Sequence, residues 1–254
     1  MYATYAVIVL ALLVVVAILS RARRGSQPIH PPQYPQTVFL TYKTVAELPN
    51  EVVTHIRELN PGFTVHAYGD PECVAFLHQF FGAGHARFFL DIPDGPIKAD
   101  FWRACVIYVY GGVYLDADSR LTRPLAEFVI HDIDLCTSGS MTRDRVNPIV
   151  IVAKPKNPII WRCIEIMLSK RSQPYNYWRY SICPALFQAL NEFIPNFKHN
   201  GEGVYRARDG RKVQLLHERP WRRTVDARTM WKGCECIRNH SPGYANRAHK
   251  FVKK

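Results

Sequence analysis

Residues Tyr108–Asp118 read YVYGGVYLDAD, an apolar run that passes through two glycines and ends in two carboxylates. In an extended segment, residues two apart project to the same side, so Asp116 and Asp118 are expected to face one cation while Ala117 points away. Mg²⁺ and Mn²⁺ prefer carboxylate oxygens, retain waters and take their remaining ligands from substrate phosphates. The stretch therefore predicts a metal site at the end of a strand. A polar turn after a strand is the alternative.

A helix is predicted immediately before this segment, starting at Asp94-Gly95-Pro96. Proline suits the first helical turn because its φ is already helical and its missing N–H has no partner there. An apolar stripe with i, i+3, i+4, i+7 spacing follows, and Gly111 is placed to end the helix in a left-handed conformation. The stripe consists of Phe101, Ala104, Cys105 and Tyr108. A short strand, 113–115, is expected after the helix.

Two charged residues lie on the same predicted helix. Asp100 and Arg103 are three residues apart, so they neighbour each other beside the buried stripe. A surface ion pair of this kind contributes only about a few tenths of a kcal/mol. The alternative is ligand binding, since a guanidinium offers a planar fork to phosphate oxygens and a carboxylate accepts hydrogen bonds from sugar hydroxyls.

The combined pattern resembles a known enzyme family. Ala99-Asp100-x-x-Arg103, followed by Tyr108-x-Tyr-Gly-Gly-x-Tyr-Leu-Asp-x-Asp118, is similar to the signature of the sugar transferases with an Asp-x-Asp motif, glycosyltransferase family 32. This family includes yeast-type Golgi mannosyltransferases and inositol phosphoceramide mannosyltransferases, and the clostridial glucosylating toxins share its core. The combination is more specific than its parts, because helix, double glycine, strand and both acidic pairs must occur in one order.

The resemblance implies a role for each charged residue. Asp100 and Arg103 would hold the donor sugar and its phosphate, Asp116 would contact ribose or sugar, and Asp118 would ligate Mn²⁺ or Mg²⁺. The chemistry agrees, since a divalent cation neutralises the departing nucleoside diphosphate. The resemblance also implies a GT-A-like, Rossmann-type nucleotide-sugar domain and retention of the anomeric configuration.

Length and pattern independently favour one α/β domain. The chain has 254 residues, of which 48% are hydrophobic, and its N-terminal third alternates between strand and helix patterns. The expected elements are a strand at 38–42, a helix at 49–59, a strand at 63–68 and a helix at 71–81. This order is typical of a doubly wound, mainly parallel sheet. We therefore expect residues 37–254 to form the GT-A-like domain.

The N-terminus differs from the rest of the chain. Residues 6–19 are uninterrupted aliphatic and small residues, and together with residues 2–5 they are just long enough for a membrane helix. A cleaved signal peptide is the rival interpretation, but no basic residue precedes the apolar core. The predicted organisation is a membrane anchor with a basic flank at 1–24 and a proline-rich linker at 25–36.

The orientation of this segment stays open. Arg21, Arg23 and Arg24 follow the apolar stretch, and the positive-inside tendency would place the catalytic domain on the cytoplasmic side. The resemblance instead implies a single-pass protein of the Golgi or a related endomembrane, with its domain in the lumen.

Three further residues are expected at the site. The loop after the first strand of a doubly wound sheet meets the nucleotide, which points to Thr41 and Tyr42 as base or ribose contacts, or to an ordinary strand end. By resemblance, Asn147 begins a family strand and reaches the sugar or acceptor. Ser181-Ile-Cys-Pro184 resembles a family Gly-Pro helix start, with Cys183 in place of glycine.

The C-terminal part offers candidates for a late metal ligand. Family members close the donor site with a late His and a Ser-x-Trp-like element, and Asn239-His240-Ser-Pro-Gly-Tyr244 is the nearest match. His240 is thus a candidate ligand beside Asp118, and His217 competes with it. Cys234 and Cys236 raise the question of structural zinc, but their spacing differs from the usual knuckle.

The net charge of +12 admits several partners. It would suit anionic lipid headgroups, a nucleotide-sugar donor or nucleic acid. Because no known nucleic-acid motif occurs, membrane proximity is preferred and no nucleic acid is expected.

The function predicted from the sequence is a metal-dependent, retaining transfer of a hexose, with mannose the first choice, from a nucleotide sugar to a hydroxyl of a glycan, glycolipid or protein. A metal-dependent nucleotidyl or phosphoryl transferase and a noncatalytic, basic, membrane-associated binding module are the alternatives.

Overall fold

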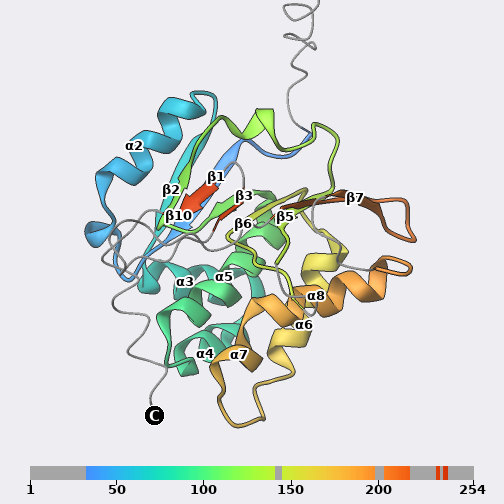
Figure 1. Cartoon of the computed structure of the whole chain (residues 1–254). Helices are drawn as coiled ribbons and strands as arrows, with labels where there is room; N and C mark the ends of the chain where they lie inside the picture. Colours follow the sequence, from blue (N-terminus) through green and yellow to red (C-terminus); the bar gives the residue numbers. More distant parts are fainter. Residues whose placement is uncertain (1–32, 141–144, 198–202, 218–232, 235–236, 240–254) are drawn as a thin grey trace, which may run out of the picture. The chain divides into compact units, whose positions relative to one another are not determined.

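A computed structural model describes residues 33–140, 145–197, 203–217, 233–234 and 237–239 (Figure 1). These residues form an α/β domain around a seven-stranded sheet with the order β2-β1-β3-β6-β5-β8-β7. The expected membrane anchor and most of the expected linker lie outside the described residues. Within the described ranges, no helix is both long enough and apolar enough to cross a membrane.

The sheet is mixed but mostly runs in one direction. β1, β2, β3, β5 and β8 are oriented alike, whereas β6 and β7 run the opposite way. The strands are β1 (Thr37–Thr41), β2 (Thr64–Tyr68), β3 (Gly112–Leu115), β5 (Leu135–Ser138), β6 (Val150–Ala153), β7 (Gly203–Arg206) and β8 (Lys212–Leu216). This arrangement confirms the α/β class and the mostly parallel sheet.

Helices cover both faces of the sheet and create two cores. On one face, α2 (Asn50–Leu59) packs Ile56 against alternate side chains of β1 and β3, including Val38 and Val113. The other face carries the larger core, to which Phe39 and Tyr114 belong. This core takes in α3 (Asp70–Phe81), α4 (Ala83–Asp91), α5 (Gly95–Tyr110), α6 (Pro158–Leu168), α7 (Tyr177–Tyr180) and α8 (Ile182–Phe193), which lie together in Figure 1.

The predicted β-α-β-α order is confirmed for the first four elements, whose bounds differ from the expected ones by one residue at each shifted end. Helix α4 was not predicted. It begins at Ala83, next to Gly82 at φ +83° and before Gly84, and such closely spaced glycines usually indicate a loop. Ala86, Phe88 and Phe89 nevertheless hold the segment against the core.

Helix α5 differs from the amphipathic helix that the sequence predicts. Its central residues are buried on every side, including Trp102 and Val106 outside the expected stripe. The reason is its position between the sheet and the surrounding helices α3, α4, α6 and α8, which leaves no face for solvent. Asp100 and Arg103 are therefore buried as well, which excludes the alternative of a routine surface ion pair.

Two glycines join α5 to β3 in conformations that other residues rarely adopt. Gly111 ends the helix at φ +66°, as expected, and Gly112 follows at φ +86°. A Cβ on Gly112 would lie 2.6 Å from the Thr37 carbonyl oxygen on the neighbouring strand. The double glycine thus allows β3 to turn directly out of a buried helix and pair with β1.

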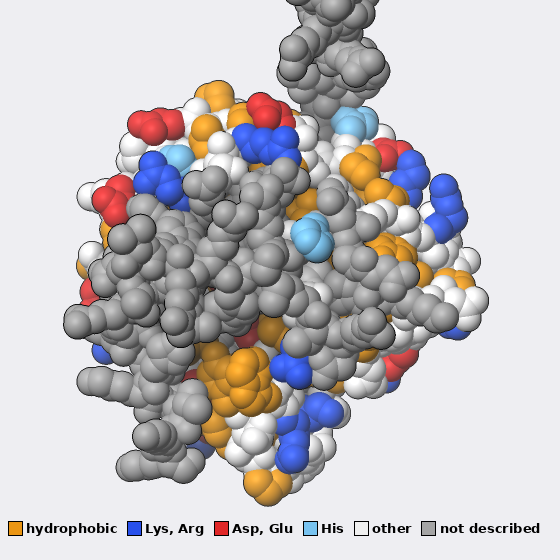
Figure 2. Space-filling model, in the orientation of Figure 1, with side chains coloured by type: hydrophobic (Ala, Val, Ile, Leu, Met, Phe, Trp, Pro, Cys, Tyr) orange, Lys and Arg blue, Asp and Glu red, His pale blue; other side chains and the backbone are white. Residues whose placement is uncertain are grey.

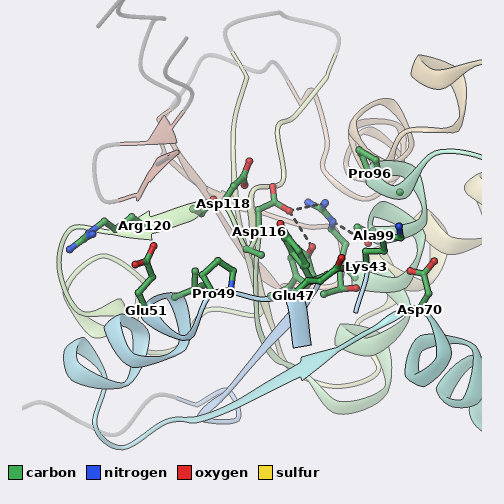
Figure 3. A pocket seen from close by; sticks show the side chains of 18 of the residues that line it. Lys43, Glu47, Pro49, Glu51, Asp70, Pro96, Ala99, Asp116, Asp118 and Arg120 are labelled. Carbon is green, nitrogen blue, oxygen red and sulfur yellow. Dashed lines mark hydrogen bonds and ion pairs between the residues drawn. The ribbon is translucent and has the colours of Figure 1, made fainter. Parts of the chain in front are cut away.

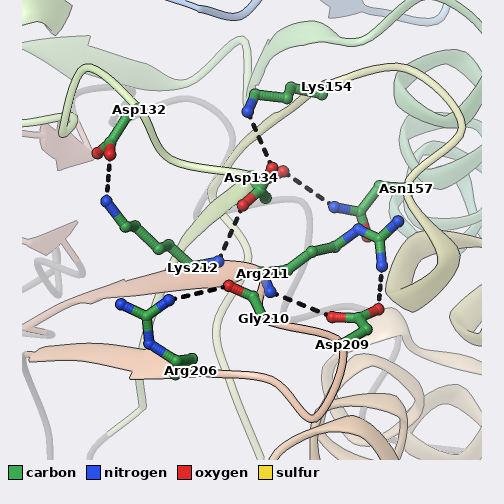
Figure 4. A network of polar contacts seen from close by, with 9 residues as sticks. All are labelled: Asp132, Asp134, Lys154, Asn157, Arg206, Asp209, Gly210, Arg211 and Lys212. Carbon is green, nitrogen blue, oxygen red and sulfur yellow. Dashed lines mark hydrogen bonds and ion pairs between the residues drawn. The ribbon is translucent and has the colours of Figure 1, made fainter.

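At the opposite end of the sheet, charged side chains tie the starts of β5 and β8 together (Figure 4). Asp134 accepts from Lys154 Nζ at 2.9 Å and from the backbone N–H of Lys212 at 2.9 Å. Asp132 pairs with Lys212. These contacts stabilise the end of the sheet that lies away from Asp116.

Candidate active site

A pocket of about 770 Å³ opens where β1 and β3 end (Figure 3). Its walls come from the segment after β1, the start of α2, the first turns of α5 and the turn after β3. Its lining includes six carboxylate or cationic side chains besides Arg103 and Asp116, namely Lys43, Glu47, Glu51, Asp70, Asp118 and Arg120. In Figure 3, Arg120 and Glu51 lie toward one end of the pocket and Asp70 toward the other.

The two carboxylates of the Asp-x-Asp triplet both line this pocket. The strand ends at Leu115, and Ala117 and Asp118 belong to a turn that is closed by a 2.8 Å bond from Ser119 N–H to the Asp116 carbonyl oxygen. The expectation that an extended backbone aligns the two carboxylates is therefore wrong. A tight turn brings Asp118 back to the pocket instead.

Arg103 lies beneath Asp116 and is almost completely enclosed. Its Nη2 is 2.8 Å from Asp116 Oδ1 and 3.0 Å from Asp100 Oδ1, with the arginine side chain only 7% exposed. Nη1 donates to the Pro148 carbonyl oxygen at 2.7 Å, and Nε donates to the Ala99 carbonyl oxygen at 3.3 Å. The guanidinium is thus engaged by acceptors of the protein itself and holds Asp116 from below.

Tyr114 completes this arrangement on the β3 side. Its hydroxyl donates to Asp116 Oδ1 at 3.2 Å, and the Arg103 guanidinium lies over its ring, 4.5 Å from the centroid. Burial, together with the adjacent carboxylates, raises the pKa of Tyr114 well above its ordinary value, so the phenol remains a donor. Arg103 and Tyr114 therefore both donate to the same oxygen of Asp116, which leaves its orientation little freedom.

The buried charges have opposing influences on one another. Burial alone lowers the pKa of Arg103, but the negatively charged carboxylates of Asp116 and Asp100 raise it above its ordinary value. Burial raises the pKa of Asp100, and Arg103 and the Ile182 N–H offset part of that effect. Arg103 consequently stays cationic at every physiological pH.

Asp100 connects the site to a second helix. Its Oδ2 accepts from the backbone N–H of Ile182 at 3.0 Å, at the first residue of α8, which Ser181 caps by accepting from Cys183 N–H at 3.2 Å. A carboxylate is favourable there because the N-terminus of a helix carries partial positive charge. Asp100 does not line the pocket. It lies behind Arg103 and joins α5 to α8.

The structure places the other predicted residues as follows. Thr41 and Tyr42 line the pocket, and the Thr41 hydroxyl lies 3.6 Å from Cys73 Sγ. Asn147 is half-buried and is not among the pocket residues, although Pro148 beside it accepts from Arg103. His217 is exposed. His240 and the Cys236 of the zinc alternative lie outside the described residues.

Backbone pairing nevertheless brings the late segment next to the triplet. A small sheet with the order β4-β10-β9 forms from β4 (Ser119–Leu121), β9 (Gly233–Cys234) and β10 (Ile237–Asn239). Asn239 pairs with Ser119, the residue that follows Asp118. The chain position just before His240 thus lies beside the turn that carries the carboxylates.

Sequence reasoning missed several pocket residues. Three of them are Lys43 in the loop after β1, His55 on α2 and Arg120 on the edge strand β4. None of these segments carries a recognisable sequence motif. His55 Nε2 donates to the Leu121 carbonyl oxygen at 2.8 Å and so ties α2 to β4. The predicted end of the first strand could have suggested Lys43, since it follows Thr41 and Tyr42 directly.

The residues present suit a hard divalent cation that arrives with its substrate. Asp118 and Asp116 supply carboxylate oxygens, and among the described residues no group of three or more His, Cys, Asp or Glu side chains is placed to hold a metal. A Mg²⁺ or Mn²⁺ ion with one or two carboxylates completes its shell with water and phosphate oxygens. The carboxylates that line the pocket fit such an ion.

Comparison with known proteins gives three findings. Residues 51–135 match the family described as glycosyltransferase sugar-binding region containing DXD motif. An initiation-specific alpha-1,6-mannosyltransferase of Candida albicans (strain SC5314 / ATCC MYA-2876) is 27% identical over 75 residues, which are 29% of this chain and 20% of that protein. The chain thus matches about one fifth of the length of this relative.

The fold also has a solved counterpart. The structure of PaToxG glycosyltransferase superposes with a TM-score of 0.52 at 14% sequence identity, over 64% of this chain and 70% of that one. This likeness concerns the fold alone. The matched family region contains α5, the double glycine and the Asp116–Asp118 turn. Residues 51–135 of this chain are therefore similar to the sugar-binding region of glycosyltransferases that contain a DXD motif.

Proposed function

We propose that this protein is a metal-dependent, retaining hexosyltransferase that transfers a hexose, with mannose the first choice, from a nucleotide sugar to a hydroxyl of a glycan, glycolipid or protein. The observation that carries the proposal is that Asp116 and Asp118 both line the pocket at the end of β3, with the buried Arg103 paired to Asp116. The relative named for alpha-1,6-mannosyl transfer supports mannose as the first sugar to test.

Asp118 would hold the divalent cation together with the donor diphosphate, and His240 is proposed as a late ligand because Asn239 pairs with Ser119. When bound, such a cation supplies charge neutralisation for the departing nucleoside diphosphate. Asp116, fixed by Arg103 and Tyr114, would accept from hydroxyls of the donor. Thr41 and Tyr42, at the end of β1, would contact the base or ribose.

The resemblance implies that Arg103 holds the donor phosphate, but its contacts within the protein indicate a different role. Its guanidinium is directed to acceptors of the protein, so we assign it as a positioning residue for Asp116. Lys43 and Arg120 also line the pocket, and both side chains are exposed. They are the cations that we propose to meet the donor phosphates.

Retention follows from the family resemblance and constrains the chemistry. Asp116 Oδ1, the carboxylate oxygen nearest to Arg103, already accepts two hydrogen bonds from the protein, which makes Asp116 a poor nucleophile. We therefore propose that the acceptor hydroxyl attacks on the same face from which the diphosphate leaves, without a covalent sugar-enzyme intermediate. Positioning of both substrates and stabilisation of the leaving group would supply the rate enhancement.

The decisive experiment measures hydrolysis of a panel of nucleotide sugars by the full chain with Mn²⁺ or Mg²⁺. We expect release of intact nucleoside diphosphate, and we expect Asp118→Asn to lower the rate by about two orders of magnitude or more, because it removes charge where the metal-diphosphate binds. Asp209→Asn is the matched control, since Asp209 lies in an exposed turn between β7 and β8. It should leave the rate unchanged.

Other outcomes would identify the alternatives. A transferred phosphate in place of a released diphosphate would indicate a nucleotidyl or phosphoryl transferase. Failure to hydrolyse any donor would oppose catalysis and favour a binding module. An unaltered rate in Asp118→Asn, with its fold intact by circular dichroism, would remove Asp118 from the site.

We also propose that the apolar residues 6–19 anchor the protein in an endomembrane. Extraction of cell membranes with alkaline carbonate tests this directly. An anchored chain stays in the pellet, whereas a peripheral one is released.

A further inference from the structure

A surface loop and the short helix α7, which together span residues 169–181, combine aromatic and basic side chains. The segment 169–181 contains Lys170, Arg171 and Arg179 but no acidic residue. Trp178 is 57% exposed and Tyr175 is 38% exposed, and both exposed fractions are large for aromatic side chains. Figure 2 shows hydrophobic side chains beside Lys and Arg side chains in the region where Figure 1 places α7 and the loop before it.

The protein holds this segment in a defined shape. The Tyr180 hydroxyl is buried and donates to the carbonyl oxygens of Lys170 at 2.8 Å and Gln173 at 2.9 Å, which closes the loop. The Asn176 side chain accepts from Arg179 N–H at 3.0 Å and caps α7. The exposed indole of Trp178 is therefore presented by an ordered backbone.

The same segment is attached to the candidate active site at two points. Tyr175 donates a hydrogen bond to the carboxylate of Asp94, the N-cap residue of α5, which immediately precedes Gly95 and Pro96 in the pocket wall. At the other end, Ile182 N–H donates to Asp100. The aromatic and basic surface thus borders the pocket wall that the first turn of α5 provides.

Cations also surround the exposed indole. The Arg145 guanidinium lies 5.7 Å from the Trp178 ring centroid, and Arg179 is the next residue of the chain. Asp94 engages Tyr175, and Asp91 on nearby α4 pairs with Arg87 at 2.9 Å. The surface therefore has an excess of positive charge around an amphipathic aromatic side chain.

We propose that this surface, formed by Arg145, Lys170, Arg171, Tyr175, Trp178 and Arg179, docks on an anionic lipid bilayer. Tryptophan and tyrosine favour the membrane–water interface because one part of each ring is apolar and another is polar. Lysine and arginine are attracted to anionic headgroups at the same depth. The surface has both features and lacks the carboxylates that such headgroups would repel.

The length of the N-terminal segment agrees with this partner. Thirteen residues, 20–32, separate the apolar stretch at 6–19 from the described domain. Fully extended, they span at most about 45 Å, so a membrane anchor in that stretch would keep the start of the domain within about 45 Å of the bilayer. Docking at 145 and 170–179 would then turn the Gly95–Pro96 wall of the pocket toward the lipid.

The test uses the full chain reconstituted into phosphatidylcholine vesicles, with and without phosphatidylserine, whose acyl chains carry bromine as a fluorescence quencher. Subtracting the emission spectrum of Trp178→Phe from that of the wild type isolates the emission of Trp178. The signals of the other tryptophans and of any anchor cancel in this difference. We expect this difference to be quenched and blue-shifted in phosphatidylserine vesicles, and to revert in high salt.

Two variants that lose equal charge determine whether the basic residues of this surface bind the phosphatidylserine headgroups. Lys170→Gln/Arg171→Gln/Arg179→Gln should lose the phosphatidylserine-dependent quenching, whereas Arg57→Gln/Arg206→Gln/Arg208→Gln, which removes equal charge elsewhere on the surface, should keep it. Trp178 emission that stays solvent-like in both vesicles would overturn the proposal. A blue shift in detergent that depends on protein concentration would also overturn it, since a second copy would then cover the surface. Donor hydrolysis is measured separately and bears on neither result.

Discussion

At the scale of single residues, Arg103 is the centre of the site. Two carboxylates and two backbone carbonyl oxygens surround its guanidinium, and the carboxylates come from different elements, α5 and the β3 turn. Desolvating three charges is favourable only when geometry and hydrogen bonding are good, and removing one partner leaves the others uncompensated. Arg103 therefore matters for folding and for the orientation of Asp116.

We expect Arg103→Met to lower the free energy of unfolding by about 3–5 kcal/mol, because the buried Asp100 and the half-buried Asp116 would then lack a counter-charge. Urea unfolding followed by circular dichroism measures the change. The control is Arg87→Met, which breaks an ion pair of nearly equal length, 2.9 Å to Asp91, on the exposed face of α4. It should cost less than about 0.5 kcal/mol. Equal losses in the two variants would contradict the structural role of Arg103.

His240 provides a second prediction at this scale. As a ligand of the donor-bound metal beside Asp118, His240 should matter at least as much as an outer-shell partner, so His240→Ala should weaken the apparent affinity for Mn²⁺ by about ten-fold or more. His217→Ala is the matched control because that histidine is exposed and does not line the pocket. Titration of donor hydrolysis with Mn²⁺ measures both. An unchanged titration for His240→Ala would exclude it as a ligand.

At the scale of elements, the junction between α5 and β3 determines where the carboxylates lie. Gly112 packs against the backbone of β1, and β3 pairs in parallel with that strand through Val113 and Tyr114. The chain can leave a buried helix and enter a central strand within two residues only because neither glycine has a Cβ. Asp116 is reached four residues later, at the end of the strand.

We expect Gly112→Ala to destabilise the protein more than Gly210→Ala, although both glycines have φ +86°. At Gly210 no atom lies within 4 Å of an added Cβ, so only backbone strain of about 1–2 kcal/mol applies. At Gly112 the contact of 2.6 Å with Thr37 O adds a clash that must separate β1 from β3. Thermal unfolding compares the two variants. Similar melting temperatures would show that β1 and β3 tolerate the separation.

At the scale of the whole molecule, the two cores enclose most of the described cysteines. Cys73, Cys105, Cys136 and Cys163 are fully buried, and none of them forms a disulfide with another described residue. Burial raises the pKa of Cys73 to about 12, with the Thr41 hydroxyl opposing the shift. Because the thiolate is the reactive form, buried thiols with raised pKa values are inert until the domain opens.

We expect iodoacetamide at pH 8 to leave these four cysteines unmodified in the native protein and to label them in guanidinium chloride. The sign follows from the pKa of Cys73: only about one part in ten thousand is thiolate at pH 8, and reactivity rises as pH approaches 12. Peptide mass spectrometry locates the label. Half-buried Cys183 is the internal comparison, and Cys183→Ser confirms its peptide. Rapid labelling of Cys105 or Cys163 in the native state would contradict the packed core.

The parts that the sequence predicted correctly are those governed by local rules. Pro96 at a helix start, Gly111 at a helix end and the alternating strand patterns depend on steric preferences of a few neighbouring residues. Helix α4 was missed because tertiary packing of Phe88 and Phe89 overrides the nearby glycines. The direction of β6 could not be predicted, since strand orientation depends on chain crossings that no local pattern records.

The amino-acid sequence by itself determined the α/β class, the helix–glycine–strand order and the identity of Asp100, Arg103, Asp116 and Asp118 as one constellation. Only the tertiary structure decided how each of them is placed and which groups it contacts. A turn rather than an extended strand presents Asp118, and Arg103 is buried against Asp116 because the sheet and the helices around α5 exclude solvent. The sequence specifies residue identity and the geometry of neighbouring residues. The burial of a side chain and its hydrogen-bond partners depend on which distant segments pack together.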